Sequence, residues 1–203
     1  MKIICIGRNY AEHIRELGND KPAEPVLFLK PETALVTGNR SVLIPPFTND
    51  LHHEAELVVQ ISREGKNIPM DEALNYIGGL ALGIDFTARD LQARLKSASL
   101  PWEISKAFDD SAPVSPFIPF PGPHSSHDIQ FSLRVNGELR QQGNTAQMIF
   151  PFAEIIHFAS RFFRLLPGDM IFTGTPAGVS AVKPGDHLEG YIFEDKLLDF
   201  RMV

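Results

Sequence analysis

Short apolar runs, broken at close intervals by proline and glycine, dominate the hydrophobic pattern of this chain. Sixteen prolines and fifteen glycines in 203 residues favour short strands joined by many turns. Runs rich in β-branched or alternating apolar residues predict strands at 2–6, 26–29, 42–44, 54–61, 79–85, 130–135, 138–142, 170–172, 187–192 and 196–202. Asn136-Gly137, between two of these runs, indicates a two-residue hairpin turn.

Few segments have helical periodicity. Apolar residues at helical spacing predict one amphipathic helix near residues 152–163. Shorter helices are predicted at 10–17, at 71–76 and from 87 to about 96, the first and last of them with capping-box patterns, Asn9 with Glu12 and Thr87 with Asp90. Residues 99–120 contain four prolines and are expected to be irregular. Strands outnumber helices and no βαβ alternation dominates, so we expect an α+β fold built on a strongly curved, β-rich roll.

Bulk composition limits the possible functions. A chain of 203 residues, 43% hydrophobic and 22% charged, is expected to form a single globular domain over 1–203. The net charge of −6 argues against nucleic-acid binding, and no apolar stretch approaches the ~20 residues of a membrane helix. Residues 1–6 are too short for a signal sequence. The single cysteine, Cys5, cannot form an internal disulfide and fits a reducing cytoplasm.

The most informative polar residues are acids that interrupt apolar runs. Glu54 and Glu56 share one face of a predicted strand, about 6.6 Å apart along it. Val58 follows on the same face, so the pair is expected to be at least half-buried and to need neutralisation. Asp85 ends a second apolar run. Three hard oxygen donors suit Mg²⁺ or Mn²⁺, whereas the alternative is a solvated strand edge or partners for Lys and Arg.

Six segments together resemble the fumarylacetoacetate hydrolase superfamily, in particular its short acylpyruvase and oxaloacetate decarboxylase branch. They occur in order over almost the whole chain: 5–13 (Cys-Ile-Gly-Arg-Asn-Tyr-Ala-Glu-His), 51–57 (Leu-His-His-Glu-Ala-Glu-Leu), 83–92 (Gly-Ile-Asp-Phe-Thr-Ala-Arg-Asp-Leu-Gln), 105–109 (Ser-Lys-Ala-Phe-Asp), 135–138 (Val-Asn-Gly-Glu) and 173–179 (Thr-Gly-Thr-Pro-Ala-Gly-Val). One departure is Ser180, where the family often has glycine, which is expected to stiffen that loop.

The resemblance implies a β-rich roll, a homodimer, and Mg²⁺ or Mn²⁺ held by Glu54, Glu56 and Asp85. Residues 1–25 would contribute a strand and a lid that orders on substrate binding. The remaining residues implied to act in the site are a lid dyad, an active-site lysine and three substrate contacts: His13, Glu16, Lys106, Arg89, Gln92 and Thr175.

The residue types make chemical sense for a small 2-oxo acid. Its adjacent oxygens chelate a hard cation, which polarises the 2-oxo group. His13 and Glu16 share a helical face three residues apart, so the acid can orient the ring of a base and favour its protonated form. Lys106 adds positive charge where an anion develops.

We therefore expect an Mg- or Mn-dependent hydrolase that cleaves a C–C bond in acylpyruvate-type 2,4-dioxo acids and also decarboxylates oxaloacetate. The alternatives are an oxaloacetate keto–enol tautomerase and a catalytically silent module that binds metal or small acids. Glycoside hydrolysis is disfavoured because Glu54 and Glu56 share one strand face and do not flank a cleft.

Each residue taken alone also has an ordinary structural interpretation. His13 could be a surface histidine paired with Glu16, Lys106 an exposed lysine, Arg89 a member of a helix-surface ion pair and Thr175 a turn residue before proline. His52 and His53 could also be ligands, but His53 faces away from the glutamates in a regular strand and is not assigned to the site. His124 and His127 lie in a Pro/Ser-rich loop and are expected to be solvated.

Overall fold

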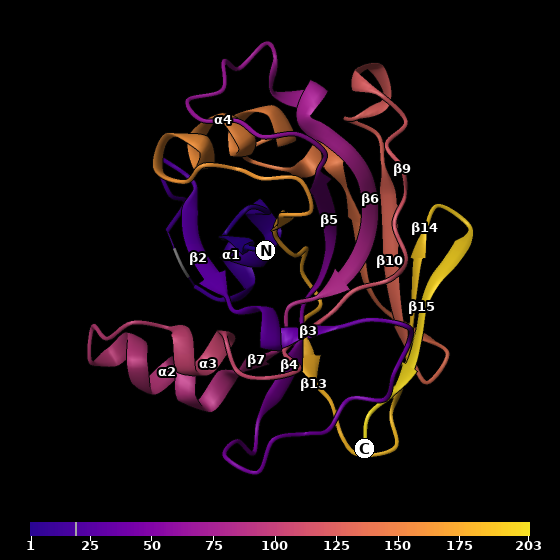
Figure 1. Cartoon of the computed structure of the whole chain (residues 1–203). Helices are drawn as coiled ribbons and strands as arrows, with labels where there is room; N and C mark the ends of the chain where they lie inside the picture. Colours follow the sequence, from indigo (N-terminus) through magenta and orange to yellow (C-terminus); the bar gives the residue numbers. More distant parts are fainter. Residues whose placement is uncertain (19) are drawn as a thin grey trace.

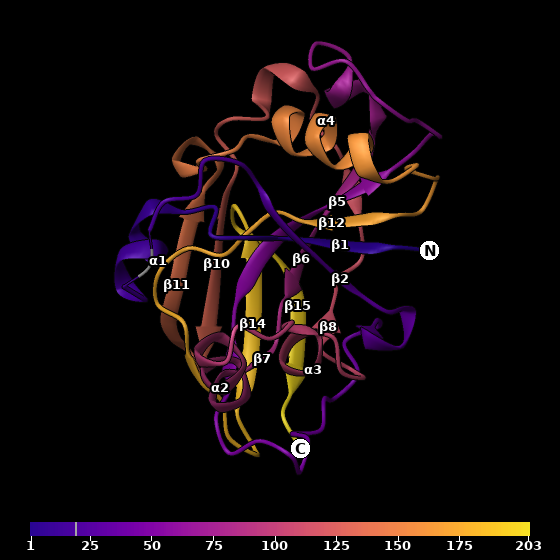
Figure 2. The ribbon, with the colours of Figure 1, turned by 90° about the vertical axis from the view of Figure 1, so that its left-hand side faces the viewer.

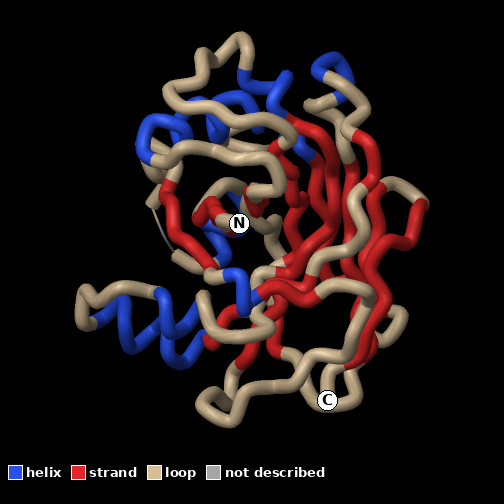
Figure 3. The backbone as a smooth tube through the Cα atoms, in the orientation of Figure 1, coloured by secondary structure: helices blue, strands red, loops and turns tan. Residues whose placement is uncertain are grey.

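A computed structural model describes residues 1–18 and 20–203 and contains two main sheets. The larger has the order β2 (Val26–Lys30), β1 (Ile3–Gly7), β12 (Met170–Phe172), β5 (Ala55–Ile61), β6 (Ile77–Ile84) and β9 (Ile118–Pro119). The second has the order β11 (Glu138–Asn144), β10 (Gln130–Val135), β14 (His187–Ile192) and β15 (Asp195–Arg201). Smaller sheets join β13 (Ser180–Ala181), β4 (Leu51–His53) and β7 (Thr87–Ala88), and β3 (Leu35–Val36) with β8 (Ala112–Pro113). The predicted α+β class with curved sheets is confirmed (Figures 1 and 3).

Helices lie at opposite ends of the sheets. In Figure 1, α4 (Phe152–Phe162) covers one end of the large sheet, whereas α2 (Arg89–Ser97) and α3 (Glu103–Lys106) lie at the other. The turned view of Figure 2 shows α1 (Ala11–Glu16) beside the second sheet. In the part of the chain that the structure describes, four 3₁₀ turns complete the helical elements: η1 (Glu32–Ala34), η2 (Ala73–Tyr76), η3 (Pro123–Ser125) and η4 (Thr145–Gln147). Within the described residues, no helix is both long and apolar enough to cross a membrane.

The central strand β5 is buried on both faces, which explains its nearly continuous apolar sequence. Leu57 and Val59 belong to the main core, which includes residues of the second sheet such as Phe131. Val58 points the other way, into a smaller cluster with Phe172. At Gly83 of β6, an added Cβ would lie 2.6 Å from a ring carbon of Phe172, so only glycine fits there. The face of β5 that carries Val58 is the face that bears the acidic pair.

Most predicted elements are confirmed, and the hairpin is the sharpest case. Asn136 and Gly137 have φ values of 54° and 81°, as a type I′ turn between β10 and β11 requires. The predicted helix near 152–163 is α4, and it buries Phe152, Ile155 and Ala159. Residues 42–44 form an extended segment bonded to 201–203 and contain no assigned strand.

Both predicted capping boxes are wrong, because the polar side chains have tertiary partners instead. Neither α1 nor α2 has a side-chain cap. The Asn9 amide donates to the carbonyls of Phe150 (3.0 Å) and Thr173 (2.7 Å) and accepts from the Phe150 N–H at 2.7 Å. Thr87 donates its hydroxyl to the Asp85 carbonyl. The segment 99–120 is also less irregular than predicted, since it contains α3, β8 and β9.

Candidate active site

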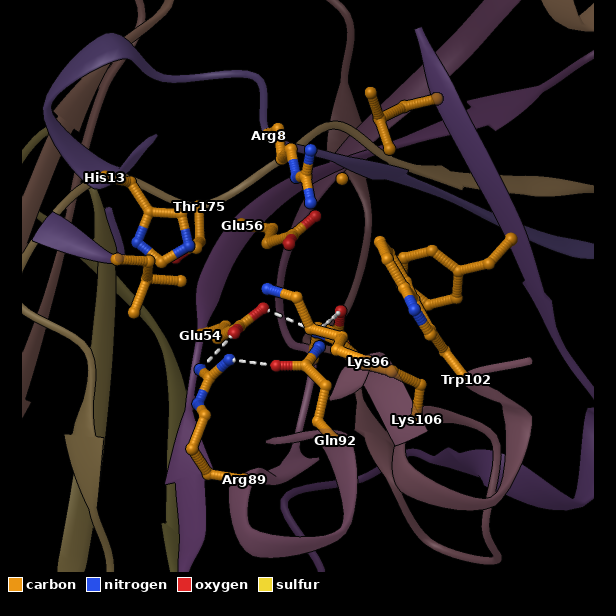
Figure 4. Close-up of a pocket in the computed structure, with 15 residues that line it drawn as sticks. Arg8, His13, Glu54, Glu56, Arg89, Gln92, Lys96, Trp102, Lys106 and Thr175 are labelled. Carbon is orange, nitrogen blue, oxygen red and sulfur yellow. Dashed lines mark hydrogen bonds and ion pairs between the residues drawn. The ribbon is translucent and has the colours of Figure 1, made fainter. Parts of the chain in front are cut away.

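Three carboxylates meet where β5 begins and β6 ends. The antiparallel register pairs Ala55 of β5 with Ile84 of β6. Glu54 precedes Ala55 and Asp85 follows Ile84, so these two residues are also neighbours across the strands. The Asp85 N–H donates to the Glu54 carbonyl at 2.8 Å. Glu56 lies on the same face as Glu54. One oxygen from each carboxylate lies within 4.8 Å of the others, and the three residues are only 1–4% exposed. The strand pattern predicted this juxtaposition, and Figure 4 shows both glutamates facing the cavity.

Cationic side chains hold two of these carboxylates. Lys106, at the end of α3, places Nζ 2.6 Å from Glu54 Oε2 and 2.7 Å from Asp85 Oδ2. Arg89, the first residue of α2, lies 2.5 Å from Glu54 Oε1 and donates to the Gln92 side chain at 2.6 Å. The predicted helical face of Arg89 and Gln92 therefore points at the carboxylate cluster.

Lys30 is a site residue that the sequence reasoning missed. It ends β2, is 3% exposed, and lies 2.8 Å from Asp85 Oδ1. Its ammonium also donates to the Ser111 hydroxyl at 2.9 Å and to the Lys106 carbonyl. The signal was present, because a charged residue that ends an apolar strand is the same pattern that identified Asp85. Lys30 thus orients both a predicted metal ligand and the segment that carries Lys106.

Glu56 differs from the other two carboxylates because the ion pairs of Lys30, Lys106 and Arg89 go to Glu54 and Asp85. Its partner is the backbone N–H of Gly174, at 2.7 Å. Gly174 has φ +102°, and an added Cβ would lie 2.6 Å from the Asn9 Cβ. Burial, followed by the charges of Asp85 and Glu54, raises the pKa of Glu56 well above its ordinary value. At Glu54 burial is also the largest influence, but Lys106 and Arg89 outweigh it and lower its pKa.

The carboxylate cluster fits a hard divalent cation. The ion pair between Asp85 Oδ1 and Lys30 lacks hydrogen-bond geometry, so that buried oxygen has no hydrogen bond. A cation held by the three carboxylates would satisfy this oxygen. The donors are all carboxylate oxygens, which Mg²⁺ and Mn²⁺ prefer.

His13 and Glu16 are in contact, as their spacing predicts. His13 Nδ1 lies 3.2 Å from Glu16 Oε2, and Glu16 Oε1 accepts from the Gly178 N–H at 3.0 Å. His13 is 6% exposed, so it is not a surface histidine. Glu16 favours the protonated ring as expected, but burial outweighs the combined attraction of Glu54 and Glu16, so the pKa of His13 is lowered. The ring is therefore neutral at pH 7 and able to accept a proton.

Thr175 and His53 belong to one supporting network. The Thr175 hydroxyl donates to the Ala55 carbonyl at 2.8 Å and accepts from the Gln141 amide at 2.7 Å. Gln141 also accepts from the Ala55 N–H at 2.9 Å and lies 2.8 Å from His53 Nδ1. His53 Nε2 lies 2.8 Å from the Ser180 hydroxyl. His53 is therefore outside the cavity, and Ser180 has a partner of its own, an interaction that glycine would lack.

The other histidines that were not assigned to the site do not line its cavity. His52 lies 2.9 Å from Asp50, and His124 and His127 are exposed. A second cluster, His187 with Glu189 and Asp199, has the residue types of a metal site. Lys196 lies between its acids, 3.1 Å from Glu189 and 2.7 Å from Asp199, so the cluster is an ion-pair network on the surface.

One cavity joins these groups (Figure 4). Its lining includes every predicted catalytic, metal-binding and substrate-binding residue except Glu16, which lies behind His13. It also includes residues that sequence reasoning missed: Ile6, Gly7, Arg8, Leu17, Phe28, Lys96 and Trp102. Lys96 had a usable signal, because Arg89, Gln92 and Lys96 follow one face of α2 at spacings of three and four.

Comparison with known proteins agrees with this arrangement. The family model described as fumarylacetoacetate (FAA) hydrolase C-terminal matches residues 2–199. A mitochondrial oxaloacetate tautomerase of Rattus norvegicus is 47% identical over 193 residues, covering 94% of this chain and 86% of the relative. A mitochondrial oxaloacetate decarboxylase of Dictyostelium discoideum is 43% identical over 185 residues, covering 91% and 85%.

Among solved structures, a fumarylpyruvate hydrolase from Pseudomonas aeruginosa in complex with Mn²⁺ and pyruvate superposes with a TM-score of 0.94. It is 42% identical, and the match covers 100% of this chain and 89% of that one. The relatives thus include enzymes named for hydrolysis, decarboxylation and tautomerisation on one fold.

Proposed function

Because the chain belongs to the fumarylacetoacetate hydrolase family, we propose that it is a divalent-metal-dependent hydrolase of acylpyruvate-type 2,4-dioxo acids that also decarboxylates oxaloacetate. The observation that carries the proposal is the buried cluster of Glu54, Glu56 and Asp85, with oxygens within 4.8 Å of one another. These residues face a cavity that also contains His13 and Lys106. We expect residues 1–203 to act as one catalytic domain, with residues 1–25 supplying the strand and lid.

Glu54, Glu56 and Asp85 would hold Mg²⁺ or Mn²⁺. When bound, the cation supplies Lewis acidity that polarises the 2-oxo group and stabilises negative charge as the carbon–carbon bond breaks. Arg89 and Gln92, linked at 2.6 Å, are placed to bind the substrate carboxylate from α2. The Thr175 hydroxyl, fixed by Ala55 and Gln141, would contact the substrate from the opposite wall.

His13 is the proposed general base. With Nδ1–H donated to Glu16, the other ring nitrogen is left to take a proton from a water molecule that attacks the distal carbonyl carbon. Because burial lowers the pKa of the ring, the base is in its neutral form at pH 7. The bond from Glu16 to the Gly178 N–H connects α1 to the loop that carries Thr175, so lid position and substrate contact are coupled.

Lys106 is the proposed electrostatic stabiliser and does not act as a base. Burial opposes its charge, but Asp85 and Glu54 raise its pKa to about 12, so it is protonated throughout the physiological range. A fixed ammonium in a buried site stabilises the pyruvate enolate, which forms when the hydrated distal carbonyl leaves as a carboxylic acid or when oxaloacetate loses CO₂. Hydrolysis and decarboxylation therefore share Lys106, whereas hydrolysis alone requires His13 as base toward water.

Two alternatives remain in view. A keto–enol tautomerase would use the same enolate without bond cleavage, and the name of the rat relative favours this candidate. A silent binding module is disfavoured because the site retains the paired His13 and Glu16, and a binding protein has no chemical need for that dyad.

The proposal is tested with acetylpyruvate and oxaloacetate in the presence of Mg²⁺, Mn²⁺ or a chelator. We expect metal-dependent formation of pyruvate from both substrates. Loss of the oxaloacetate enol absorbance without pyruvate would indicate the tautomerase. Tight binding of oxalate by calorimetry, with no turnover of any 2-oxo acid, would indicate the silent module and overturn the proposal.

We further propose that the chain forms a homodimer through the apolar face beside α3. Phe47 and Ile104, 48% and 57% exposed, lie there with Leu91 and Phe108. The same face carries Arg94 and Glu103, opposite charges that a twofold axis can pair between copies. Ile104→Glu should halve the mass measured by light scattering. Leu139→Glu, at an exposed apolar residue outside this face, should leave the mass unchanged. An unchanged mass for Ile104→Glu would exclude this face.

The proposed compartment is the cytoplasm, on the basis of Cys5 as a buried free thiol. The rat and Dictyostelium relatives are named as mitochondrial. Fractionation of the source cells would distinguish the two compartments.

A further inference from the structure

Gln141 is a buried amide beside the site that takes no part in the proposed cleavage. It lies on β11 of the second sheet and is 1% exposed. Its side chain bonds both to the strand that carries the acidic pair, at Ala55, and to the loop that carries Thr175. Gln141 therefore fixes that loop relative to the strand.

Backbone groups determine which way the Gln141 amide is turned. The Ala55 N–H can only donate, so the amide atom 2.9 Å from it is the oxygen. The Pro176 carbonyl can only accept, so the amide atom 3.0 Å from it is the nitrogen. The second N–H of this nitrogen donates to the Thr175 hydroxyl at 2.7 Å, and the oxygen also accepts from His53 Nδ1 at 2.8 Å. All four hydrogen-bonding positions of Gln141 are thus in use.

The direction of the Thr175 hydroxyl follows from these bonds. Its single proton goes to the Ala55 carbonyl, which lies 2.8 Å away and can only accept. The Gln141 N–H occupies one of the two lone pairs of the hydroxyl oxygen. One lone pair remains, and Thr175 lines the cavity. Toward the cavity the hydroxyl can therefore accept a hydrogen bond but cannot donate one.

An acceptor at this position limits what Thr175 can bind. The carboxylate, 2-oxo and distal carbonyl oxygens of a keto acylpyruvate all accept, so none of them can bond to this hydroxyl. His13 presents a second acceptor to the cavity, because its Nδ1 is bonded to Glu16 and its ring is neutral.

His13 and Thr175 both line the cavity, and Figure 4 shows them on the same side of it. The bond from the Gly178 N–H to Glu16 also ties α1 to the loop three residues beyond Thr175. Two acceptors that face the same space fit a molecule with two donor protons. In hydrolysis that molecule is water.

We propose that Gln141 is a positioning residue for hydrolysis, which holds the Thr175 hydroxyl as an acceptor so that this hydroxyl and His13 together orient the attacking water. In the attack, the water gives one proton to the free ring nitrogen of His13. Its oxygen forms a bond to the distal carbonyl carbon, and the π pair of that carbonyl moves onto the carbonyl oxygen. The second proton stays on the water oxygen and bonded to Thr175. That oxygen then belongs to the substrate, so Thr175 contacts the substrate through it. This inference rests on the proposed hydrolase function.

The test compares acetylpyruvate hydrolysis with oxaloacetate decarboxylation, which needs no water nucleophile. In the Mg²⁺-loaded enzyme, Thr175→Val should lower kcat for hydrolysis about tenfold, the upper range for one neutral hydrogen bond. Decarboxylation should fall less, by at most about threefold, the lower part of that range. KM for acetylpyruvate should not rise, because the hydroxyl contacts the water and not the keto substrate. Thr175→Ser, which keeps the hydroxyl, should restore most of the hydrolysis rate.

A double variant tests whether Gln141 acts through Thr175. Gln141→Met, which keeps the volume but removes the amide, should slow hydrolysis more than decarboxylation. Combined with Thr175→Val it should cause no further loss of hydrolysis, because its effect passes through that hydroxyl. Gln142→Met, at the exposed neighbour on the same strand, is the matched control and should leave both reactions unchanged. If Gln141→Met does not fold, Thr175→Val and Thr175→Ser still decide whether the hydroxyl orients water.

Failure of this inference and failure of the proposed function give different results. No loss of hydrolysis in Thr175→Val, an equal loss in the two reactions, or additive losses in the double variant would overturn the inference while the hydrolase proposal stands. A raised KM for acetylpyruvate at unchanged kcat would also overturn it and would indicate a bond from the enol hydroxyl of the substrate. If the wild-type enzyme releases pyruvate from neither substrate with Mg²⁺ or Mn²⁺, the hydrolase proposal itself is wrong.

Discussion

The two sides of the cavity are built in different ways. The carboxylate side is formed by β5 and β6, whose paired backbones fix Glu54, Glu56 and Asp85 before any ligand arrives. The opposite side rests on α1, a six-residue helix whose dyad is tied to the rest of the site by the bond from Glu16 to Gly178. A buried sheet suits a group that must stay in place, and a short helix with few ties suits a segment that must move aside for substrate. We therefore propose that the first side retains the metal and the second transfers the proton.

Glu56→Gln provides the strongest test of the contrast. We propose Glu56 as a metal ligand, so its loss should weaken Mg²⁺ or Mn²⁺ binding at least about a hundredfold, the upper range for a changed metal-site residue. The metal-free variant should fold normally, since one acid fewer is buried beside Glu54 and Asp85. Calorimetric metal titration and melting of the metal-free protein measure both effects. Glu189→Gln, in the surface ion-pair network, is the matched control, and unchanged metal affinity in Glu56→Gln would contradict the assignment.

His13→Ala should affect catalysis without affecting the metal. Loss of a general base lowers the rate of acetylpyruvate hydrolysis by about 10²–10⁴-fold. Oxaloacetate decarboxylation needs no water nucleophile, so its rate should fall far less. Steady-state assays of both reactions, with metal content measured on the same samples, give the comparison. An equal loss in the two reactions, or loss of metal, would remove the distinction between the two sides of the cavity.

Glu16→Gln should have a smaller effect of the same kind. The carboxylate orients the His13 ring and opposes the fall in its pKa, so the amide should reduce hydrolysis by about tenfold, less than the 10²–10⁴-fold expected for loss of the base itself. It should also weaken the link between α1 and the loop at Gly178. If kcat for hydrolysis is unchanged, Glu16 has no positioning role.

The pH dependence should show the smallest and most specific effect. Burial lowers the pKa of His13 below its ordinary 6.5, and the neutral ring is the active form. The rate of hydrolysis should therefore stay constant as the pH falls through 6.5 and decrease only at a lower pH. Glu16→Gln should shift this decrease to a still lower pH. Folding stability has the same sign, because the unfolded chain binds the proton more readily, so the His13 contribution weakens as pH falls below 6.5. A hydrolysis limb above pH 6.5 would contradict a buried neutral base.

Local pattern predicted most of the strands and the acidic ligands, because strand alternation and strand ends are properties of a few adjacent residues. Glu54, Glu56 and Asp85 interrupt apolar runs and were identified on that basis. The resemblance supplied Lys106, whose helix α3 lies in a segment expected to be irregular. The three-residue spacing of His13 and Glu16 predicted their contact. It did not predict the burial of His13, which depends on tertiary packing and sets the direction of its pKa shift.

The residues that sequence reasoning missed reach the cavity through tertiary contacts. Asn9 matches a helix cap in sequence, but its amide connects Phe150 and Thr173, and that anchoring directs Arg8 into the cavity. Lys30 meets Asp85 only because β2 lies beside β1 in the large sheet. In each case a polar side chain bonds to a residue far away in the sequence and not to its neighbours along the chain.

Anomalous diffraction from a crystal soaked with Mn²⁺ and oxalate is the most direct measurement of the central claim. We predict one strong manganese peak within about 2.0–2.6 Å, the usual length of bonds from hard cations to oxygen, of Glu54, Glu56 and Asp85, with oxalate in the cavity beside it. No manganese at saturating concentration, or a peak only at the cluster of His187, Glu189 and Asp199, would contradict the account.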